Sequence, residues 1–212
     1  MTSSDDPERV LILTYAPAEG RAALAALLAL DDALALVMRT TTEPALGQMR
    51  LAWWREALER LDPAPPPAEP VLQALAGAGL AGAPLVPIVH GWEVLIEEEW
   101  LDEDALRRFG EGRGSLFAAA GRALGASGDP LEAAGQGWAL ADLARNLNNA
   151  DEAAMARALA EPLLQRALTA RWSRPGRALG AMAHIARRDL GGEAKGAPAR
   201  VARLLWHRLT GR

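Results

Sequence analysis

The chain has 212 residues and a formal net charge of −4, and half of its residues are hydrophobic, chiefly alanine and leucine. A chain of this length can enclose a sizeable core, and its lack of net positive charge argues against a nucleic-acid partner. Because it has no cysteine and a single lysine, Lys195, the sequence excludes disulfides, thiol nucleophiles, cysteine-ligated metals and a phosphate-loop lysine.

The first ten residues, MTSSDDPERV, are acidic and polar, unlike a secretory signal. The longest apolar run, AALAALLAL at 22–30, ends at Asp31 and is too short to span a bilayer. We therefore expect a cytoplasmic protein without a transmembrane segment.

The first predicted helix covers residues 18–39, where apolar side chains recur at intervals of three and four residues: Leu27, Leu30, Leu34 and Val37. The sequence TTTEP at 40–44 ends this helix and begins the next. Either Thr41 or Thr42 is the expected N-cap of that second helix, because threonine hydroxyls accept hydrogen bonds from a first-turn amide.

The second predicted helix, residues 44–61, contains two adjacent tryptophans, Trp53 and Trp54. Adjacent side chains on a helix point about 100° apart, so both rings cannot face one apolar stripe squarely. The stripe that includes Met49, Trp53 and Ala57 is the cleaner one. We therefore expect Trp53 to pack inward and Trp54 to lie at the boundary of the core.

The Pro-rich segment 62–70 cannot be helical and serves as a connector. No alternating strand pattern follows it. Three glycines, Gly110, Gly112 and Gly114, lie inside one predicted helix and indicate close backbone packing. We predict an all-α protein whose residues 1–212 form a single globular bundle, with later helices near 71–77, 85–100, 104–125, 130–147, 151–170, 175–189 and 198–209.

Charged residues gather at one end of the first predicted helical pair. Asp31 and Asp32 end an apolar stripe, and Arg39 and Arg50 flank the turn between the two helices. Carboxylates and arginines placed together could hold a metal ion and a phosphate. Taken alone, the same residues are more typical of an ion-paired surface exposed to water.

Three further patterns have simpler explanations. His90, Glu93 and Glu97 share one helix face and are expected to be a polar surface, because a di-iron bundle would need matching motifs elsewhere. The sequence GEGRG at 110–114 lacks the strand–turn–helix context of a dinucleotide loop. The arginine-rich end of the chain could touch acidic lipid, although we expect its apolar residues to pack on the bundle instead: Val201, Leu204, Leu205 and Trp206.

Residues 15–61 resemble the N-terminal region of the squalene/phytoene synthase family. The segment RAALAALLALDD, the helix break at Glu43–Pro44 and the string RLAWWREAL at 50–58 carry the resemblance. Two later segments, 135–147 and 170–190, resemble the second motif region and the C-terminal part of bacterial relatives.

The resemblance implies an all-helical isoprenoid-synthase fold with a central cavity. Active members of the family join two prenyl diphosphates head to head. Two facing helices, each with an Asp-x-x-x-Asp motif, hold the Mg²⁺ ions that neutralise the leaving diphosphate. An apolar and aromatic wall then protects the carbocation.

This sequence departs from the family pattern at the metal-binding positions. Four residues after Asp31 and Asp32 come Ala35 and Leu36, so the first motif is half missing. In the second motif, Asp142 is present but Asn146 replaces an aspartate and brings no negative charge. The chain is also short for a catalytic member. We therefore expect no cofactor, because divalent ions need anionic ligands.

The expected function is that of a pseudoenzyme: either a partner-binding or assembly protein, or a binder of prenyl diphosphate through Arg39, Arg50 and Arg145. The family includes an assembly factor for mitochondrial respiratory complex I, which is a precedent for the former role. A structural subunit with a filled core is a further alternative. Peripheral membrane contact also stays open.

The rival hypothesis is an active Mg²⁺-dependent prenyltransferase. In that case Asp31, Asp32, Asp142 and Asn146 would hold the metal. Trp53 or Trp54 would line the cavity, and the arginines would bind the diphosphate.

Overall fold

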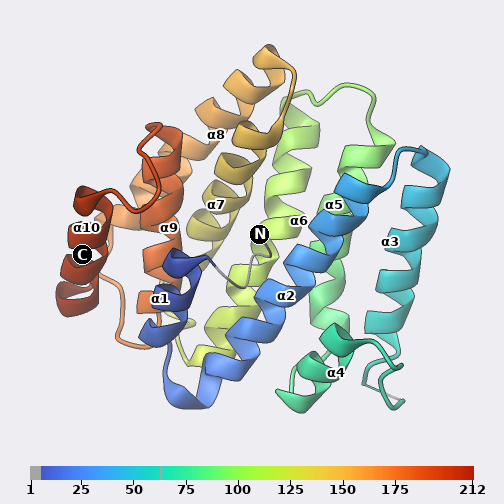
Figure 1. The fold of residues 1–212 in the computed structure, drawn as a ribbon, viewed down its shortest axis with the longest axis horizontal. Helices are drawn as coiled ribbons and strands as arrows, with labels where there is room; N and C mark the ends of the chain where they lie inside the picture. Colours follow the sequence, from blue (N-terminus) through green and yellow to red (C-terminus); the bar gives the residue numbers. More distant parts are fainter. Residues whose placement is uncertain (1–5, 63) are drawn as a thin grey trace.

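The computed structural model describes residues 6–62 and 64–212, and within them it contains ten α-helices, one short 3₁₀ helix and no strand (Figure 1). The predicted all-α class is therefore confirmed. The helices are α1 (Pro7–Tyr15), α2 (Ala18–Thr40), α3 (Pro44–Glu59), α4 (Pro70–Gly77), α5 (Val86–Glu97), α6 (Glu103–Leu124), α7 (Leu131–Asn146), α8 (Ala150–Thr169), α9 (Arg177–Leu190) and α10 (Pro198–Thr210), with the 3₁₀ helix η2 at Ala83–Leu85.

Among the described residues, α1 is the one α-helix that the sequence analysis did not anticipate. Its start signal is nevertheless present in the sequence, because Asp6 accepts a hydrogen bond from the amide of Glu8 and Pro7 occupies the first turn. The N-cap of α3 also differs from expectation. It is Glu43 rather than a threonine, and its side chain makes no capping bond.

The central helices are α6 and α7, which pack on each other and are flanked by α5 and α8. Helix α2 packs against α6, and α9 packs against α7 and α8, while α3 and α10 lie at opposite ends of the molecule (Figure 1). Leucines of α2 are fully buried in the core between these helices: Leu24, Leu27, Leu30 and Leu34.

Glycines set the distances between α5, α6 and α7. A Cβ atom on Gly112 of α6 would lie 2.5 Å from Cα of Gly91 in α5, and one on Gly114 would lie 2.6 Å from the backbone nitrogen of Gln136 in α7. Because Cβ atoms do not approach backbone so closely, larger side chains would force the helices apart. The expected close backbone packing is thus confirmed, and Arg113 lies between the two contacts.

The orientation expected for the paired tryptophans was wrong. Trp54 is buried, with 7% of its surface exposed, whereas Trp53 and Met49 are 45% and 69% exposed. The buried stripe of α3 runs through Leu51, Trp54 and Leu58, because this is the face that α3 turns to its neighbours. In the alternative stripe, which periodicity alone made more regular, Met49 and Trp53 face solvent and only Ala57 is buried.

Helix α10 also turns to the bundle the face that was expected to be exposed. Of its large apolar residues only Leu204 is buried, while the polar residues Arg200 and His207 have no exposed surface. The expectation that the apolar face of this helix packs on the bundle was therefore wrong. Among the described residues, no helix is long and apolar enough to cross a membrane.

Two histidines join α9 to α10. The rings of His184 and His207 lie 4.7 Å apart, and the backbone oxygen of Arg177 lies 3.2 Å from Nε2 of His207. Burial, followed by the charge of the neighbouring histidine and of Arg203, lowers the pKa of His184 to about 3. Burial, with the charges of Arg203 and Arg177, lowers the pKa of His207 to about 4. Both rings are therefore neutral at neutral pH.

We expect Gly91→Ala to lower the free energy of unfolding by roughly 2–4 kcal/mol, because the added Cβ would lie 2.3 Å from the backbone nitrogen of Arg113. Gly77→Ala in α4 is the matched control, since a Cβ there meets nothing within 4 Å. That change should be neutral or stabilise the protein by up to about 1 kcal/mol. Urea unfolding measures both variants, and equal effects would contradict close packing at Gly91.

We expect stability to fall as the pH drops from about 6.5 toward 4. In that range the two histidines bind protons in the unfolded state, where their pKa is the ordinary 6.5. In the folded state the lowered pKa values keep His184 and His207 neutral, so protonation favours unfolding. Urea unfolding at pH 7 and pH 5 should differ by about 2–4 kcal/mol. The double variant His184→Gln/His207→Gln should lose most of this difference. An unchanged pH dependence in the variant would assign it to other groups.

Candidate functional site

Two aspartates of the predicted motifs meet at one arginine. Asp31 comes from α2, Asp142 from α7, and Arg113 from α6 between them. The Arg113 guanidinium donates from Nε and Nη2 to both oxygens of Asp31, each at 2.8 Å, and from Nη1 to Asp142 at 2.7 Å. Two of the three aspartates that the resemblance assigned to metal binding therefore share one guanidinium as their cationic partner.

Aromatic rings hold this guanidinium on both sides. Its central carbon lies 4.5 Å from the ring centre of Trp92 in α5 and 4.4 Å from that of Trp138 in α7. Trp92 also donates a hydrogen bond from Nε1 to Asp31 at 3.2 Å. The rings contact the flat faces of the guanidinium, whereas the carboxylates accept hydrogen bonds from the N–H groups at its edge. Both sets of contacts can therefore form at the same time.

Burial strengthens the attraction within this ion pair and makes the removal of either partner costly. Arg113 and Asp31 are 4% and 5% exposed. Burial by itself would lower the pKa of Arg113, but the charges of Asp31 and Asp142 and the hydrogen bonds to them raise it above its ordinary value. The arginine is therefore charged at any relevant pH, and removing it would leave two carboxylates without their partner.

The remaining motif positions are also engaged within the protein. Asp32 forms an ion pair with Arg9 of α1 at 2.5 Å. Asn146 uses its amide nitrogen as a donor, to the backbone oxygen of Asp142 at 2.7 Å and to its carboxylate at 3.4 Å. The amide thus braces Asp142 at the end of α7.

A cavity of about 570 Å³ opens beside these residues. The Arg113 ion pair and its two tryptophans form one part of its wall. Another part is apolar and comes from α1, α2, α5, α7 and α9: Ile12, Leu28, Ala35, Met38, Leu95, Leu143, Met182 and Ile185. The cavity therefore offers both a charged region and an apolar region to one ligand.

Basic residues also line this cavity. Arg39 is exposed and makes no ion pair or hydrogen bond among the described residues, whereas Arg145 pairs with Asp189 at 2.7 Å. Asp189 also binds Arg200, which reaches Glu8 of α1 at 2.7 Å. This chain of ion pairs fixes α1 and α10 against α9 next to the cavity.

The other residues expected at the site lie elsewhere. Arg50 donates hydrogen bonds to Thr40 and Thr41 at the end of α2 and does not line the cavity. Trp53 and Trp54 pack edge to face on α3, also outside its lining. Their expected role as cavity walls is filled instead by Trp92 and Trp138. His90 lies on an exposed helix face, and Glu93 pairs with Arg55.

The ligand set for a cluster of divalent ions is poor. Asp31 and Asp142 would have to give up Arg113 to accept a cation between them, and Asp32 would have to give up Arg9. Among the described residues, no group of three or more histidines, aspartates and glutamates could hold a metal ion. The side chains that are present do not fit the Mg²⁺ cluster implied by the family resemblance.

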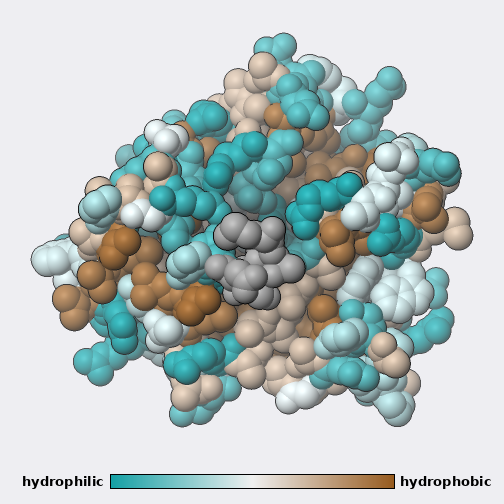
Figure 2. Space-filling view, viewed as in Figure 1, coloured by the Kyte–Doolittle hydropathy of each residue, from teal (hydrophilic) through white to brown (hydrophobic). Residues whose placement is uncertain are grey.

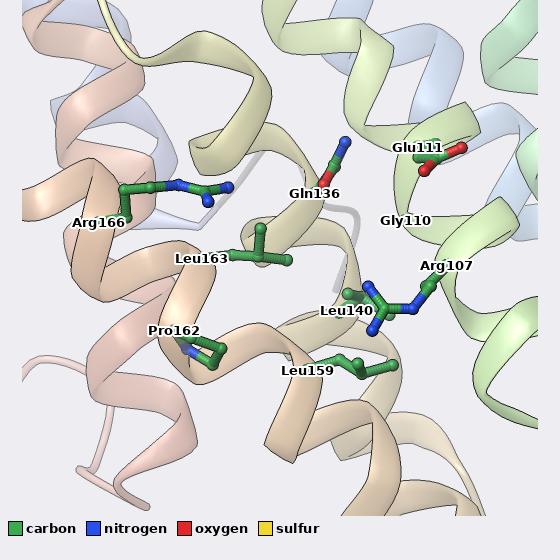
Figure 3. A pocket seen from close by; sticks show the side chains of 9 residues that line it. All are labelled: Arg107, Gly110, Glu111, Gln136, Leu140, Leu159, Pro162, Leu163 and Arg166. Atoms are coloured by element: carbon green, nitrogen blue, oxygen red, sulfur yellow. The ribbon is translucent and has the colours of Figure 1, made fainter.

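A second, smaller pocket of about 300 Å³ lies between α6, α7 and α8 (Figure 3). Arg107 of α6 and Arg166 of α8 line this pocket together with Leu140 and Leu163. Arg107 is already bound to Glu103 at 2.5 Å. None of the motif residues lines this pocket, so the larger cavity is the candidate site.

Sequence reasoning missed Arg113, Trp92 and Trp138. A usable signal existed for the arginine, because it lies in GEGRG at 110–114, between two glycines of one helix. Glycines inside a helix indicate a face in close contact with neighbours, and a charge on such a face must have buried partners. The tryptophans carried no comparable signal in their spacing.

Comparison with known proteins supports the resemblance. The sequence model of the squalene/phytoene synthase family matches residues 3–113, more than half of the chain. This match contains Asp31, Trp92 and Arg113. No curated protein and no solved structure matches the chain. With its all-α architecture, the chain is a member of the squalene/phytoene synthase family and has the isoprenoid-synthase fold of that family.

Proposed function

We propose that this protein is a non-catalytic family member that binds a prenyl diphosphate without Mg²⁺ in the cavity between α2 and α7. The single observation behind the proposal is the Arg113 guanidinium, which bridges Asp31 and Asp142. A fixed internal cation at this position occupies the carboxylates that a metal cluster would need. Without such a cluster, ionisation of a diphosphate lacks its main source of charge stabilisation.

The cavity retains what is needed to hold such a ligand. Its apolar lining suits a prenyl chain, and two arginines, Arg39 and Arg145, can meet the diphosphate. Six carboxylates and five basic residues line the cavity, so the binding relies on these two arginines rather than on an overall positive field. Arg39 is free to bind at once, whereas Arg145 must share its existing contact with Asp189.

A second candidate function rests on the surface of α3. Leu46, Met49 and Trp53 lie three and four residues apart and are 48%, 69% and 45% exposed. Contiguous exposed apolar residues that include tryptophan and methionine are typical of protein–protein interfaces. This surface supports a partner-binding role, which is compatible with ligand binding in the cavity.

We expect farnesyl diphosphate to raise the melting temperature in the presence of EDTA. Arg39→Gln and Arg145→Gln should each weaken its binding by about tenfold, as loss of one charge-assisted contact does. Arg50→Gln is the matched control, because that arginine lies outside the cavity lining and should leave binding unchanged. Calorimetric titration measures all four proteins. Binding that strictly requires Mg²⁺ would refute the proposal.

We expect Arg113→Ser to destabilise the protein by about 3–5 kcal/mol, because it leaves the buried carboxylate of Asp31 without its cationic partner. Millimolar Mg²⁺ should then stabilise the variant but not the wild type, since the freed carboxylates become available as ligands. Adding Asp31→Asn to the variant should abolish the Mg²⁺ response. Thermal unfolding with and without Mg²⁺ measures these differences. Stabilisation of the wild type by Mg²⁺ would contradict the metal-free site, and a C30 product from farnesyl diphosphate would show that the site is catalytic.

A further inference from the structure

The outward face of α10 is apolar throughout. Val201, Leu205, Trp206 and Leu209 are 40%, 48%, 56% and 75% exposed. They follow one another at intervals that place them on one side of a helix. Helices at a protein surface normally present polar residues to water, so this arrangement needs an explanation.

Folding does not require these side chains, because other residues attach α10 to the bundle. Arg200 is fully buried and binds Glu8 and Asp189 at 2.7 and 2.6 Å. Leu204 and His207 complete the inward face. The helix is thus attached by its charged side, and residues 201, 205, 206 and 209 on its apolar side stay 40–75% exposed among the described residues.

Basic residues border the apolar face on both sides. Arg203 lies three residues before Trp206, and Arg208 lies three residues after Leu205. Residues 194–212 contain no aspartate or glutamate. Among the described residues, no carboxylate forms an ion pair with any of the arginines around this helix: Arg171, Arg177, Arg203, Arg208 and Arg212.

Contacts from α9 and the preceding loop bring two of these arginines to the end of α10. Arg171 donates a hydrogen bond to the backbone oxygen of Thr210 at 3.2 Å, and Arg177 donates to that of Arg208. The Arg208 guanidinium in turn lies 5.1 Å from the ring centre of Tyr15 in α1. Figure 2 shows apolar side chains gathered over α1 and α10, where Val10 is a further exposed apolar residue.

We propose that α10 lies flat on an anionic lipid surface, with Leu205, Trp206 and Leu209 inserted among the acyl chains and the bordering arginines on the lipid phosphates. An amphipathic helix with a wide apolar face, tryptophan and flanking arginines has the features of a helix that lies in a membrane interface. The positive charge of the arginines beside the apolar face favours a lipid surface over a protein as its binding partner. A row of arginines that form no ion pair with a carboxylate among the described residues, beside an apolar stripe, is complementary to a continuous anionic surface.

Co-sedimentation of the full chain with vesicles tests this proposal. Vesicles of phosphatidylcholine with about one third phosphatidylglycerol should bind the protein at least about tenfold more strongly than pure phosphatidylcholine. The preference should shrink at high salt. Arg208→Gln should weaken binding to the anionic vesicles by about fivefold, since each arginine near such a surface contributes that factor.

The double variant Trp206→Ser/Leu209→Ser should lower vesicle binding by at least about tenfold through lost apolar contact. The matched control is Met49→Ser/Trp53→Ser, which removes equally exposed apolar residues from α3 at the opposite end of the molecule and should bind as the wild type does. All four positions are exposed, so both double variants should melt near the wild-type temperature.

Three results would overturn the proposal. The first is equal binding to neutral and anionic vesicles, and the second is an unchanged affinity of the α10 variant. The third is a dimer in size-exclusion chromatography that the α10 variant converts to a monomer, which would assign the face to a contact between two copies of the chain.

Discussion

The rest of the site depends on the buried guanidinium of Arg113 and its ion pairs with two carboxylates. Arg113 lies on the central helix α6, where water cannot solvate it, so its charge is tolerable only because Asp31 and Asp142 reach it from facing helices. Trp92 and Trp138 close its two faces. The interaction therefore fixes three helices at one point and at the same time uses the carboxylates that a metal cluster in this fold would employ.

Close helix packing makes this arrangement reachable. Glycines on α5, α6 and α7 let the three backbones approach to distances that a Cβ atom would forbid. The glycines on either side of Arg113 bring both tryptophans within cation–π distance of it. Any residue that separated these helices would lengthen the ion pair and admit water. Packing and electrostatics are thus coupled here, and neither can be altered without affecting the other.

The helices at the two ends of the molecule, α10 and α3, expose apolar side chains that would ordinarily be buried. In α10 an arginine is buried and a tryptophan is exposed, because the ion pairs of Arg200 with α1 and α9 turn the arginine side of the helix inward. In α3 the second tryptophan is buried and the first faces solvent. Both helices therefore present apolar side chains outward, which a fold selected only for its own stability would not need.

The sequence by itself determined the all-α class, nearly every helix and the incomplete motifs, because these depend on local periodicity, on proline and glycine, and on residue identity. It also indicated close packing at the glycines of α6. Only the tertiary structure decided which stripe of α3 and which side of α10 turns inward, since both faces of each helix carry apolar residues and the neighbours select one. The partnership of Arg113 with Asp31 and Asp142 was likewise decided there, because 82 and 29 residues separate the partners in the chain. Periodicity carries no information on which distant charges will meet.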